Sequence, residues 1–308
     1  MKNLQAEKIT TIIFSYNRAV QLNMLLESIT KYDHKKQLEL QIVYRYSNAD
    51  FHEGYLKLKR QYNIGWHEEH MSKKHYVLPV FPLYWRNYFW WLKYKYIKWV
   101  DSDFRNIVSS ILKSSTNDNV MFLTDDSLFI RDIELQSKVL HEIRHEPLAT
   151  AYSLRHGMNI YGGVFEKKER LIKWDRYYNH HSNEWSYSFS LDGHIYSKEA
   201  LIKKMNRIIF KNPNTLEGNM ACYANEKKLF VNHYANLNSC LVGFELNRVQ
   251  SINNNHNLNI DYQKLNILYL NGYKLGLTYS LEEPHLFRPS LINVFAYNEK
   301  ERIELYEN

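Results

Sequence analysis

The first 130 residues alternate between short apolar runs and segments in which apolar residues recur at helical spacing. The run at residues 9–15 is apolar and β-branched, Asn17 and Arg18 close it, and a helical pattern begins at Val20. The pattern predicts, in order, strand 9–15, helix 20–29, strand 38–44, helix 54–62, helix 104–112 and strand 120–123. This alternation is typical of an α/β fold with a mostly parallel central sheet flanked by helices.

Polar residues stand at the carboxyl end of each of these predicted strands. The sequences are SYNR at the first strand, YRYSN at the second and TDDS at the third. Ligands of open parallel sheets collect beyond the carboxyl ends of the strands. We therefore expect the three polar ends to converge on one cleft.

The second half of the chain is less regular. A strand is predicted at 149–154, the letters SYSFSL alternate like a strand within 185–191, and 198–210 has a helical pattern. Residues 265–273 give no signal of a separate fold, and no internal repeat or linker rich in Gly, Ser or Pro divides the chain. A single domain over residues 1–308 is the expectation.

Composition narrows the class of protein. With 308 residues, of which 44% are hydrophobic and 15% aromatic, the chain can bury a large core and is neither disordered nor fibrous. A formal charge of +7 suits an anionic partner such as a nucleotide or a lipid phosphate, although solubility alone also accounts for it. Cys222 and Cys240 are too few for a disulfide framework or a cysteine zinc site.

Two further features concern the compartment. The first residues lack the apolar core of a signal peptide, and no run of 18 uncharged apolar residues occurs. A cytoplasmic location is the simplest expectation. Attachment to one face of a membrane stays open.

Asp125 and Asp126 stand side by side after the predicted strand at 120–123. Aspartate is common in turns and at helix N-caps, which is the structural interpretation of the pair. The functional interpretation is a divalent metal site, because hard cations such as Mg²⁺ take carboxylate oxygens and keep other positions for water and substrate phosphates.

The order of motifs resembles that of nucleotide-sugar glycosyltransferases of the GT-A fold, in particular the bacterial enzymes of family 2. The resemblance is carried by TIIFSYNRAVQLNMLLESI, IVYRYSN and FLTDDS, the last similar to the TDD variant of that fold's DxD motif. Further along, NPNTLEG, LNRVQ and LNILYLNGY are similar to the acceptor and C-terminal segments of some bacterial members. The resemblance covers most of the chain except residues 67–101.

The resemblance implies roles on the donor side. The residues implied to line the nucleotide pocket are Ser15, Asn17, Arg18, Ser47 and Asn48, the last two standing where the family often has an aspartate that reads the base. Asp126 would hold Mn²⁺ or Mg²⁺, and Asp125 would hold the ribose or a metal-bound water. Ser127 supplies no third carboxylate, which leaves weak or optional metal dependence open. Arg248, with Asn247 and Gln250, either closes over the diphosphate or belongs to a capped loop.

Histidines offer no clear metal motif. His233, His256 and His285 are equal candidates for a third ligand, and the sequence does not choose among them. His194 is expected to contact the acceptor or to be a satisfied polar residue. His180 and His181 are expected at the surface.

Transfer also needs a base that takes the proton of the acceptor hydroxyl. Glu217 stands where similar enzymes place the catalytic carboxylate at a helix start, and its alternative is a first-turn glutamate that the helix dipole stabilises. Asp192 is the competing candidate, or it orients the acceptor while Gly193 lets the sugar approach the backbone. The resemblance implies inversion of the anomeric centre.

Residues 71–100 have the most unusual composition in the chain. They include six Lys or Arg, four Trp, five Tyr and two Phe, and no Asp or Glu. On a helix over residues 85–99 the aromatic face would be bordered by Arg86, Lys93 and Lys95, as in a segment that docks on an anionic membrane. The alternative is a helical subdomain that packs over the acceptor cleft. This segment defines a predicted insertion at 67–101.

The combined expectation is an inverting, metal-assisted enzyme that transfers sugar from a UDP-sugar. The acceptor would be a glycan, lipid-linked, in the synthesis of a bacterial surface polysaccharide such as capsule or lipopolysaccharide, at the inner face of the cell membrane. One alternative is a catalytically silent relative that binds sugars or acts as a scaffold. A nucleic-acid-binding protein ranks lower, because no recognised nucleic-acid module is visible and the positive charge is concentrated in one insertion.

Overall fold

The computed structural model describes residues 7–76, 99–249, 257–281 and 283–307. Its helices are α1 (Ala19–Tyr32), α2 (Ala49–Gln61), α4 (Phe104–Ser114), α5 (Ser137–His145), η2 (Arg176–Asn179), α6 (Asn183–Ser186), α7 (Lys198–Met205), α8 (Pro213–Lys227) and α9 (Tyr262–Leu270). Its strands are β1 (Ile9–Tyr16), β2 (Leu38–Arg45), β3 (Gly65–Glu68), β4 (Met71–Tyr76), β5 (Trp99–Ser102), β6 (Asn119–Thr124), β7 (Ser127–Phe129), β8 (Thr150–Ser153), β9 (Glu166–Lys168), β10 (Leu171–Asp175), β11 (His194–Ser197), β12 (Asn232–Asn236), β13 (Leu241–Gly243), β14 (Lys274–Ser280), β15 (Leu291–Tyr297) and β16 (Arg302–Tyr306).

Within the described residues the largest sheet has nine strands in the order β3-β2-β1-β6-β11-β8-β12-β10-β9. β1 lies between β2 and β6 and is parallel to both, and β3 continues the parallel order at one edge. β11 is antiparallel to β6 and β8, and β10 is antiparallel to β12 and β9. The predicted α/β class, with a mostly parallel central sheet flanked by helices, is confirmed.

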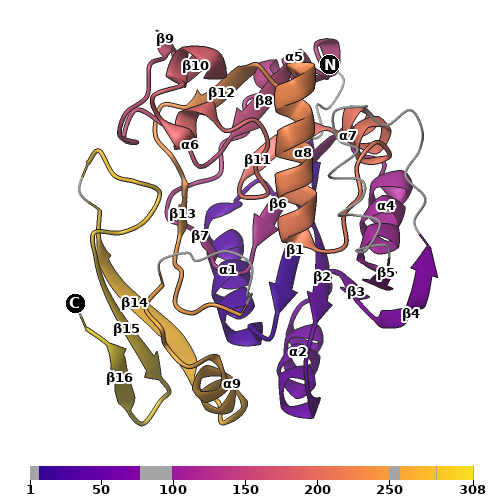
Figure 1. Ribbon diagram of the computed structural model, residues 1–308. Helices are drawn as coiled ribbons and strands as arrows, with labels where there is room; N and C mark the ends of the chain where they lie inside the picture. The colour runs from indigo at the N-terminus through magenta and orange to yellow at the C-terminus, as the bar shows by residue number, and fades with distance from the viewer. Residues whose placement is uncertain (1–6, 77–98, 250–256, 282, 308) are drawn as a thin grey trace, which may run out of the picture.

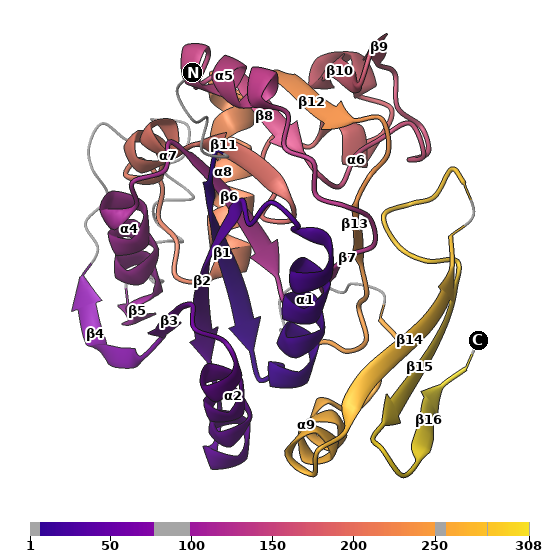
Figure 2. The same ribbon diagram turned by 180° about the vertical axis from the view of Figure 1, so that it is seen from behind.

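Alternation along β1 builds a core on both faces of this sheet. Ile9 and Ile13 are buried in one cluster with residues of α1, whereas Ile12 and Phe14 are buried in a second cluster with residues of α4, α7 and α8. Figure 1 shows α8 in front of the sheet, and Figure 2 shows α1 on the opposite face. Burial on both sides explains why β1 reads as a continuous apolar run.

Two smaller sheets complete the C-terminal half. β13 pairs with β7 in a short antiparallel ribbon, and β14, β15 and β16 form an antiparallel sheet beside α1 and α9. Figure 1 shows this last sheet at one side of the molecule. In the described part of the chain, none of the helices combines the length and the apolar character needed to cross a membrane.

Several predicted boundaries need correction. The helix predicted at 54–62 begins earlier, at Ala49, because Asn48 caps it by accepting a hydrogen bond from the Phe51 amide at 3.1 Å. The helix predicted at 198–210 ends at Met205. The alternating run at 185–191 is not a strand. It starts in α6, and its later backbone amides donate hydrogen bonds to the side chains of Tyr196 and Glu217.

The predicted insertion is only partly described. Its flanks contribute β3 to the large sheet, and β4 pairs with β5 in an antiparallel ribbon. Trp99, which the predicted helix included, is the first residue of strand β5. Residues 77–98, which include Arg86, Lys93 and Lys95, lie outside the described residues. The membrane-docking helix and the one-domain organisation both stay predictions.

Candidate active site

A cleft of about 580 Å³ lies at the carboxyl ends of β1, β2 and β6. The start of α8 and the segment at 245–249 form further parts of its wall. Predicted site residues that line it are Ser15, Arg18, Asp125, Asp126, Asp192, Glu217 and Arg248. The expected convergence of the three polar strand ends therefore occurs, although the second strand end contributes Arg45 of YRYSN and not Ser47 or Asn48.

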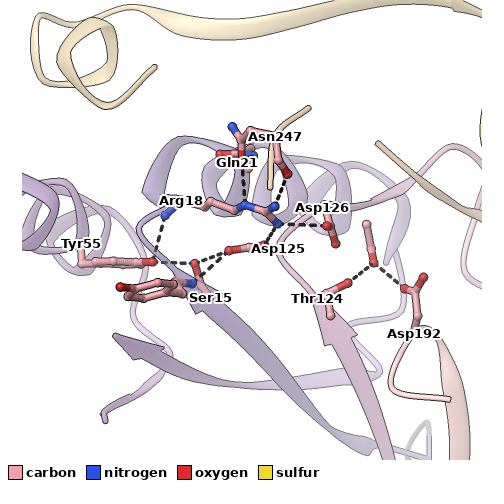
Figure 3. Close-up of polar contacts among 11 residues, drawn as sticks. Ser15, Arg18, Gln21, Tyr55, Thr124, Asp125, Asp126, Asp192 and Asn247 are labelled. Atoms are coloured by element: carbon pink, nitrogen blue, oxygen red, sulfur yellow. Dashed lines mark hydrogen bonds and ion pairs between the residues drawn. The ribbon is translucent and has the colours of Figure 1, made fainter. Parts of the chain in front are cut away.

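Arg18 joins the two aspartates at the floor of the cleft. Its Nη1 donates to Asp125 Oδ1 at 2.9 Å and to Asp126 Oδ2 at 3.0 Å (Figure 3). The side chains of Arg18 and Asp125 are 8% and 5% exposed, whereas Asp126 keeps 23% exposure. The chain thus supplies its own cation to the pair and leaves Asp126 as the carboxylate more open to the cleft.

A relay of hydroxyl groups holds Asp125 from the other side. Ser15 Oγ donates to Asp125 Oδ2 at 2.7 Å, and the Tyr16 amide also donates to this oxygen. Because the single Ser15 proton is used in this way, the Tyr55 hydroxyl must donate to Ser15 Oγ, 2.7 Å away. Tyr55 Oη in turn accepts from the Arg18 amide at 3.2 Å (Figure 3). Both oxygens of Asp125 are therefore occupied by groups of the chain.

Burial and Arg18 act in opposite directions on the two carboxyls. Burial is the largest influence on Asp125 and raises its pKa to about 6, although Arg18 pulls the pKa down. Burial also raises the pKa of Asp126, but the attraction of Arg18 and hydrogen bonds, among them one from Thr124, outweigh it and lower the pKa. Asp126 therefore stays ionised to lower pH than Asp125 does.

Arg18 also connects the C-terminal half of the chain to the aspartate pair. Its Nε donates to Asn247 Oδ1 at 2.9 Å, and its Nη2 donates to the Asn247 carbonyl oxygen. Gln21 Nε2 donates to the same Oδ1 at 3.2 Å. The two bonds from Arg18 connect residues 229 positions apart, and together with the bond from Gln21 they fix Asn247, the neighbour of Arg248 in the sequence, beside the aspartate pair (Figure 3).

The two candidate bases, Asp192 and Glu217, occupy different environments in the cleft. Asp192 Oδ2 forms an ion pair with Arg155, and Asp192 Oδ1 accepts from Ser127 Oγ. Gly193 follows with φ +71°, in the left-handed region that glycine adopts at little cost. This turn directs the chain from Asp192 into β11, whose neighbour is the strand that ends at the aspartate pair.

Glu217 lies in the second turn of α8. The helix begins with a capping box between Asn212 and Thr215 and has Pro213 in its first turn. Glu217 Oε1 accepts from the Leu191 amide at 3.0 Å, and burial raises the pKa of this carboxyl. Among the described residues no Lys or Arg forms an ion pair with Glu217. A carboxyl whose pKa is raised in this way is a better proton acceptor than an ordinary glutamate.

Three predicted pocket residues do not line the cleft. Asn17 has φ +56° and exchanges hydrogen bonds with Ser47, of 2.9 Å from its Nδ2 and 2.8 Å to its Oδ1. Asn48 caps α2. All three therefore shape the turns after β1 and β2, which is a structural role.

The histidines fall elsewhere. His194 and His233 are buried among aromatic rings, and His285 lies against Asn159. Neither His233 nor His285 lines the cleft, and His256 lies outside the described residues. His180 and His181 are exposed, as predicted.

Several lining residues were not found from the sequence. Glu69, just after β3, has Oε1 within 3.6 Å of Arg45 Nη1 and accepts a hydrogen bond from Ser102. The Arg45 guanidinium stands over the Tyr16 ring at 4.9 Å. Arg155 was missed as well. Only the YRYSN letters pointed toward this end of the cleft, and they gave no reason to prefer Arg45 over its neighbours.

The cleft offers a divalent metal few protein ligands. In the part of the chain that the structure describes, no three His, Cys, Asp or Glu residues are grouped as a metal site. Asp126 alone fits, because Mg²⁺ is often held by one or two carboxylates while water and substrate phosphates complete its octahedron. Asp125 is already occupied by Ser15, Tyr16 and Arg18.

Comparisons with known proteins give a partial structural likeness. No protein-family model matches the chain, and no curated protein matches it. Solved structures of S. aureus TarS align with 74% of this chain and 35% of theirs, at 16% identity and a TM-score of 0.39. The shorter TarS 1-349 structure in complex with UDP aligns over 75% of this chain and 58% of its own, at the same identity and TM-score. TarS 1-349 with UDP-GlcNAc gives 17% identity, a TM-score of 0.36 and 75% and 56% coverage.

Proposed function

We propose that this protein is a glycosyltransferase that transfers a sugar from a nucleoside-diphosphate donor, UDP-sugar, to a glycan acceptor. The observation that carries the proposal is the cleft itself. It is lined both by the aspartate pair at the end of β6 and by Glu217 of α8, a partly buried carboxyl with a raised pKa. A displacement at a sugar carbon needs one group that binds the sugar donor and another that acts on the hydroxyl of the sugar acceptor. The aspartate pair and Glu217 are candidates for these two roles.

The base of the donor is assigned to the end of the cleft beside Tyr16, Arg45 and Glu69. Within the described residues, Oε2 of Glu69 makes no hydrogen bond, because Ser102 and Arg45 approach Oε1. One free acceptor beside an arginine donor matches uracil, whose edge offers a single N–H flanked by carbonyl oxygens. Guanine presents two adjacent N–H donors and would need both carboxylate oxygens.

A divalent cation is proposed at Asp126. The carboxylates that line the described part of the cleft are Glu69, Asp125, Asp126, Asp192, Glu217 and Glu245, against four arginines, Arg18, Arg45, Arg155 and Arg248. A diphosphate entering this excess of negative charge would be repelled unless a cation accompanies it. Mn²⁺ or Mg²⁺ on Asp126, with Arg248 nearby, would supply that charge and stabilise the departing diphosphate.

The chemistry assigned to the chain's own residues is a single displacement. Glu217 takes the proton of the acceptor hydroxyl while the oxygen of that hydroxyl bonds to the anomeric carbon. The bond from that carbon to the diphosphate breaks, and the diphosphate leaves with the electron pair. Attack from the face opposite the leaving group inverts the anomeric centre. Asp192, held by Arg155 and Ser127, orients the acceptor.

The acceptor is proposed to be lipid-linked, in the synthesis of a bacterial surface polysaccharide at the inner face of the cell membrane. This part of the proposal is supported by the aromatic and basic composition of residues 71–100. Co-sedimentation with vesicles tests it: the protein should bind anionic vesicles better than neutral ones, and less well at high salt. Binding that ignores lipid charge would leave an acceptor-side subdomain as the role of this segment.

A panel of nucleotide sugars, with Mn²⁺ or Mg²⁺ and mixed glycan acceptors, tests the activity. We expect release of UDP from at least one UDP-sugar. Asp126→Ala should lose most turnover, and Glu217→Gln should lower kcat about a hundredfold to ten-thousandfold while nucleotide binding persists. If Asp192→Asn behaves in this way and Glu217→Gln does not, the two roles are exchanged. Binding of a nucleotide sugar without any turnover would instead favour the silent relative.

The proposed position of the nucleobase has its own test. Glu69→Gln keeps the size of the side chain but offers an N–H beside its remaining carbonyl oxygen. Affinity for UDP should fall relative to the wild type while affinity for inorganic diphosphate stays unchanged. An equal loss of affinity for UDP and for diphosphate would mean that the nucleobase lies elsewhere.

A further inference from the structure

Arg155 is a cation that lines the cleft, with 18% of its side chain exposed. It follows β8 and forms the ion pair with Asp192 Oδ2. Its guanidinium stands over the Phe287 ring at 4.7 Å. A Cβ added to Gly243 would come within 3.2 Å of Arg155 Nη2, so the backbone of β13 also lies close to the guanidinium. The side chain is therefore enclosed on several sides.

The neighbouring residue anchors this arginine. The His156 ring lies 4.9 Å from Trp174, 4.8 Å from Trp185 and 4.8 Å from Phe287, measured between ring centroids. His156 Nδ1 is also 2.8 Å from Ser153 Oγ at the end of β8. A ring packed in this way cannot turn without disrupting a fully buried cluster. The backbone at Arg155 is therefore held by the core of the fold.

Glu245, Asp126 and Glu184 also act on Arg155 through their charges, but its relation to Asp192 differs from its relation to Glu217. Asp192 is in direct contact with the guanidinium and also accepts from Ser127, so both of its oxygens are engaged in its charged form. Glu217 has no such contact and is reached by Arg155 only through space. The other titratable groups that face Glu217 are Tyr187 and Tyr196. Two carboxyls in one cleft are thus placed in opposite settings.

We infer that Arg155 is a positioning residue that fixes Asp192 as a permanent carboxylate and so reserves proton transfer for Glu217. The ion pair sets both the charge and the orientation of Asp192 at the acceptor. Arg155 also acts on Glu217 through space, where its positive charge favours the ionised, basic form of that carboxyl. The inference rests on the proposed function and adds to it the device that separates the two roles.

The pH dependence of kcat tests the inference, because a merely structural arginine would lower kcat without moving the profile. In Arg155→Met both carboxyls lose a nearby cation and bind protons more tightly, so the acid limb should move to higher pH. If the limb moves by about one pH unit, the ratio of wild-type kcat to variant kcat should be roughly tenfold larger at pH values below the limb than on the plateau. Arg155→Lys should restore the position of the limb, and Arg60→Met, an exposed arginine outside the cleft, should leave it unchanged.

A second variant covers the case in which Arg155→Met does not fold. In Asp192→Asn the guanidinium loses its charged partner, its full field acts on Glu217, and the acid limb should move to lower pH. An unmoved limb in a folded Arg155→Met, or in Asp192→Asn, overturns the inference. The proposed function fails separately, by the absence of sugar transfer from the wild type.

Discussion

Replacing Arg18 with methionine should destabilise the protein more than replacing any other arginine that lines the cleft. Methionine keeps part of the apolar stem and removes the charge that neutralises Asp125 and Asp126. The arginine and Asp125 side chains are only 8% and 5% exposed, so the aspartates would be left uncompensated in a buried setting. Removal of one partner from a buried ion pair costs about 3–5 kcal/mol. Asn247 Oδ1 still accepts from Gln21, which limits the further loss.

The assay is the free energy of unfolding from urea denaturation at pH 8 and pH 5. The matched control is Arg60→Met, whose pair with Glu53 is 70% and 49% exposed and should be worth roughly 1 kcal/mol or less. In Arg18→Met the pKa values of both aspartates rise in the folded state, so that state binds protons that the unfolded chain has released. The deficit relative to wild type should therefore be largest at pH 8 and smaller at pH 5.

Two outcomes would refute this reasoning. A loss as small as that of the control would mean that Arg18 does not compensate buried charge. A deficit that grows as the pH falls would mean that the aspartates are not its cause. Adding Asp125→Asn to Arg18→Met provides an internal check, since removing the stranded carboxylate should recover part of the stability.

The remaining predictions concern the core and the turn beside the cleft. Burial lowers the pKa values of His194 and His233 to about 3 and that of His156 well below 6.5, so the unfolded chain takes up protons that the folded state refuses. Stability should be complete above about pH 6.5 and fall on acidification by about 1.4 kcal/mol per pH unit for each histidine, as urea denaturation at pH 7, 6 and 5 would show; a flat free energy would contradict it. Gly193→Ala, at φ +71° and with its Cβ 2.4 Å from Leu241 Cδ2, should cost roughly 1–2 kcal/mol in thermal melts and lower activity; an unchanged melting temperature would contradict the strain.

Local pattern was sufficient for the first part of the fold. The β-branched run of β1, the apolar spacing of α1 and the apolar run of β6 placed these elements within a few residues of their bounds. The same pattern put the aspartate pair at a carboxyl strand end. This worked because both faces of the strands are buried, and the polar residues that follow mark where burial stops.

Long-range contacts were beyond the sequence. The bonds from Arg18 to Asn247 connect residues 229 positions apart, and nothing local to either residue signals them. The antiparallel β11 between β6 and β8, and the sheet of β14, β15 and β16, depend on pairing between distant segments. Strand pairing between distant segments leaves no periodic pattern in a single sequence.

The run at 185–191 shows how a pattern can mislead. Its alternating letters predict a strand, yet the Ser190 amide donates to Tyr196 Oη at 2.9 Å and the Leu191 amide to Glu217 at 3.0 Å. Side chains thus take the backbone groups that strand pairing would need. Phe189 and Leu191 are buried all the same, and their burial accounts for the apolar letters.

Calorimetric titration of UDP into the full chain, with and without Mn²⁺, tests the central claim most directly. The claim is that this cleft holds a nucleoside diphosphate with a divalent cation on Asp126. Wild type should bind UDP more tightly with Mn²⁺ than without it. Asp126→Ala should fold as the wild type does, because Arg18 still has Asp125, and should lose the gain from Mn²⁺. Failure of the wild type to bind UDP at millimolar concentration under either condition would contradict the account.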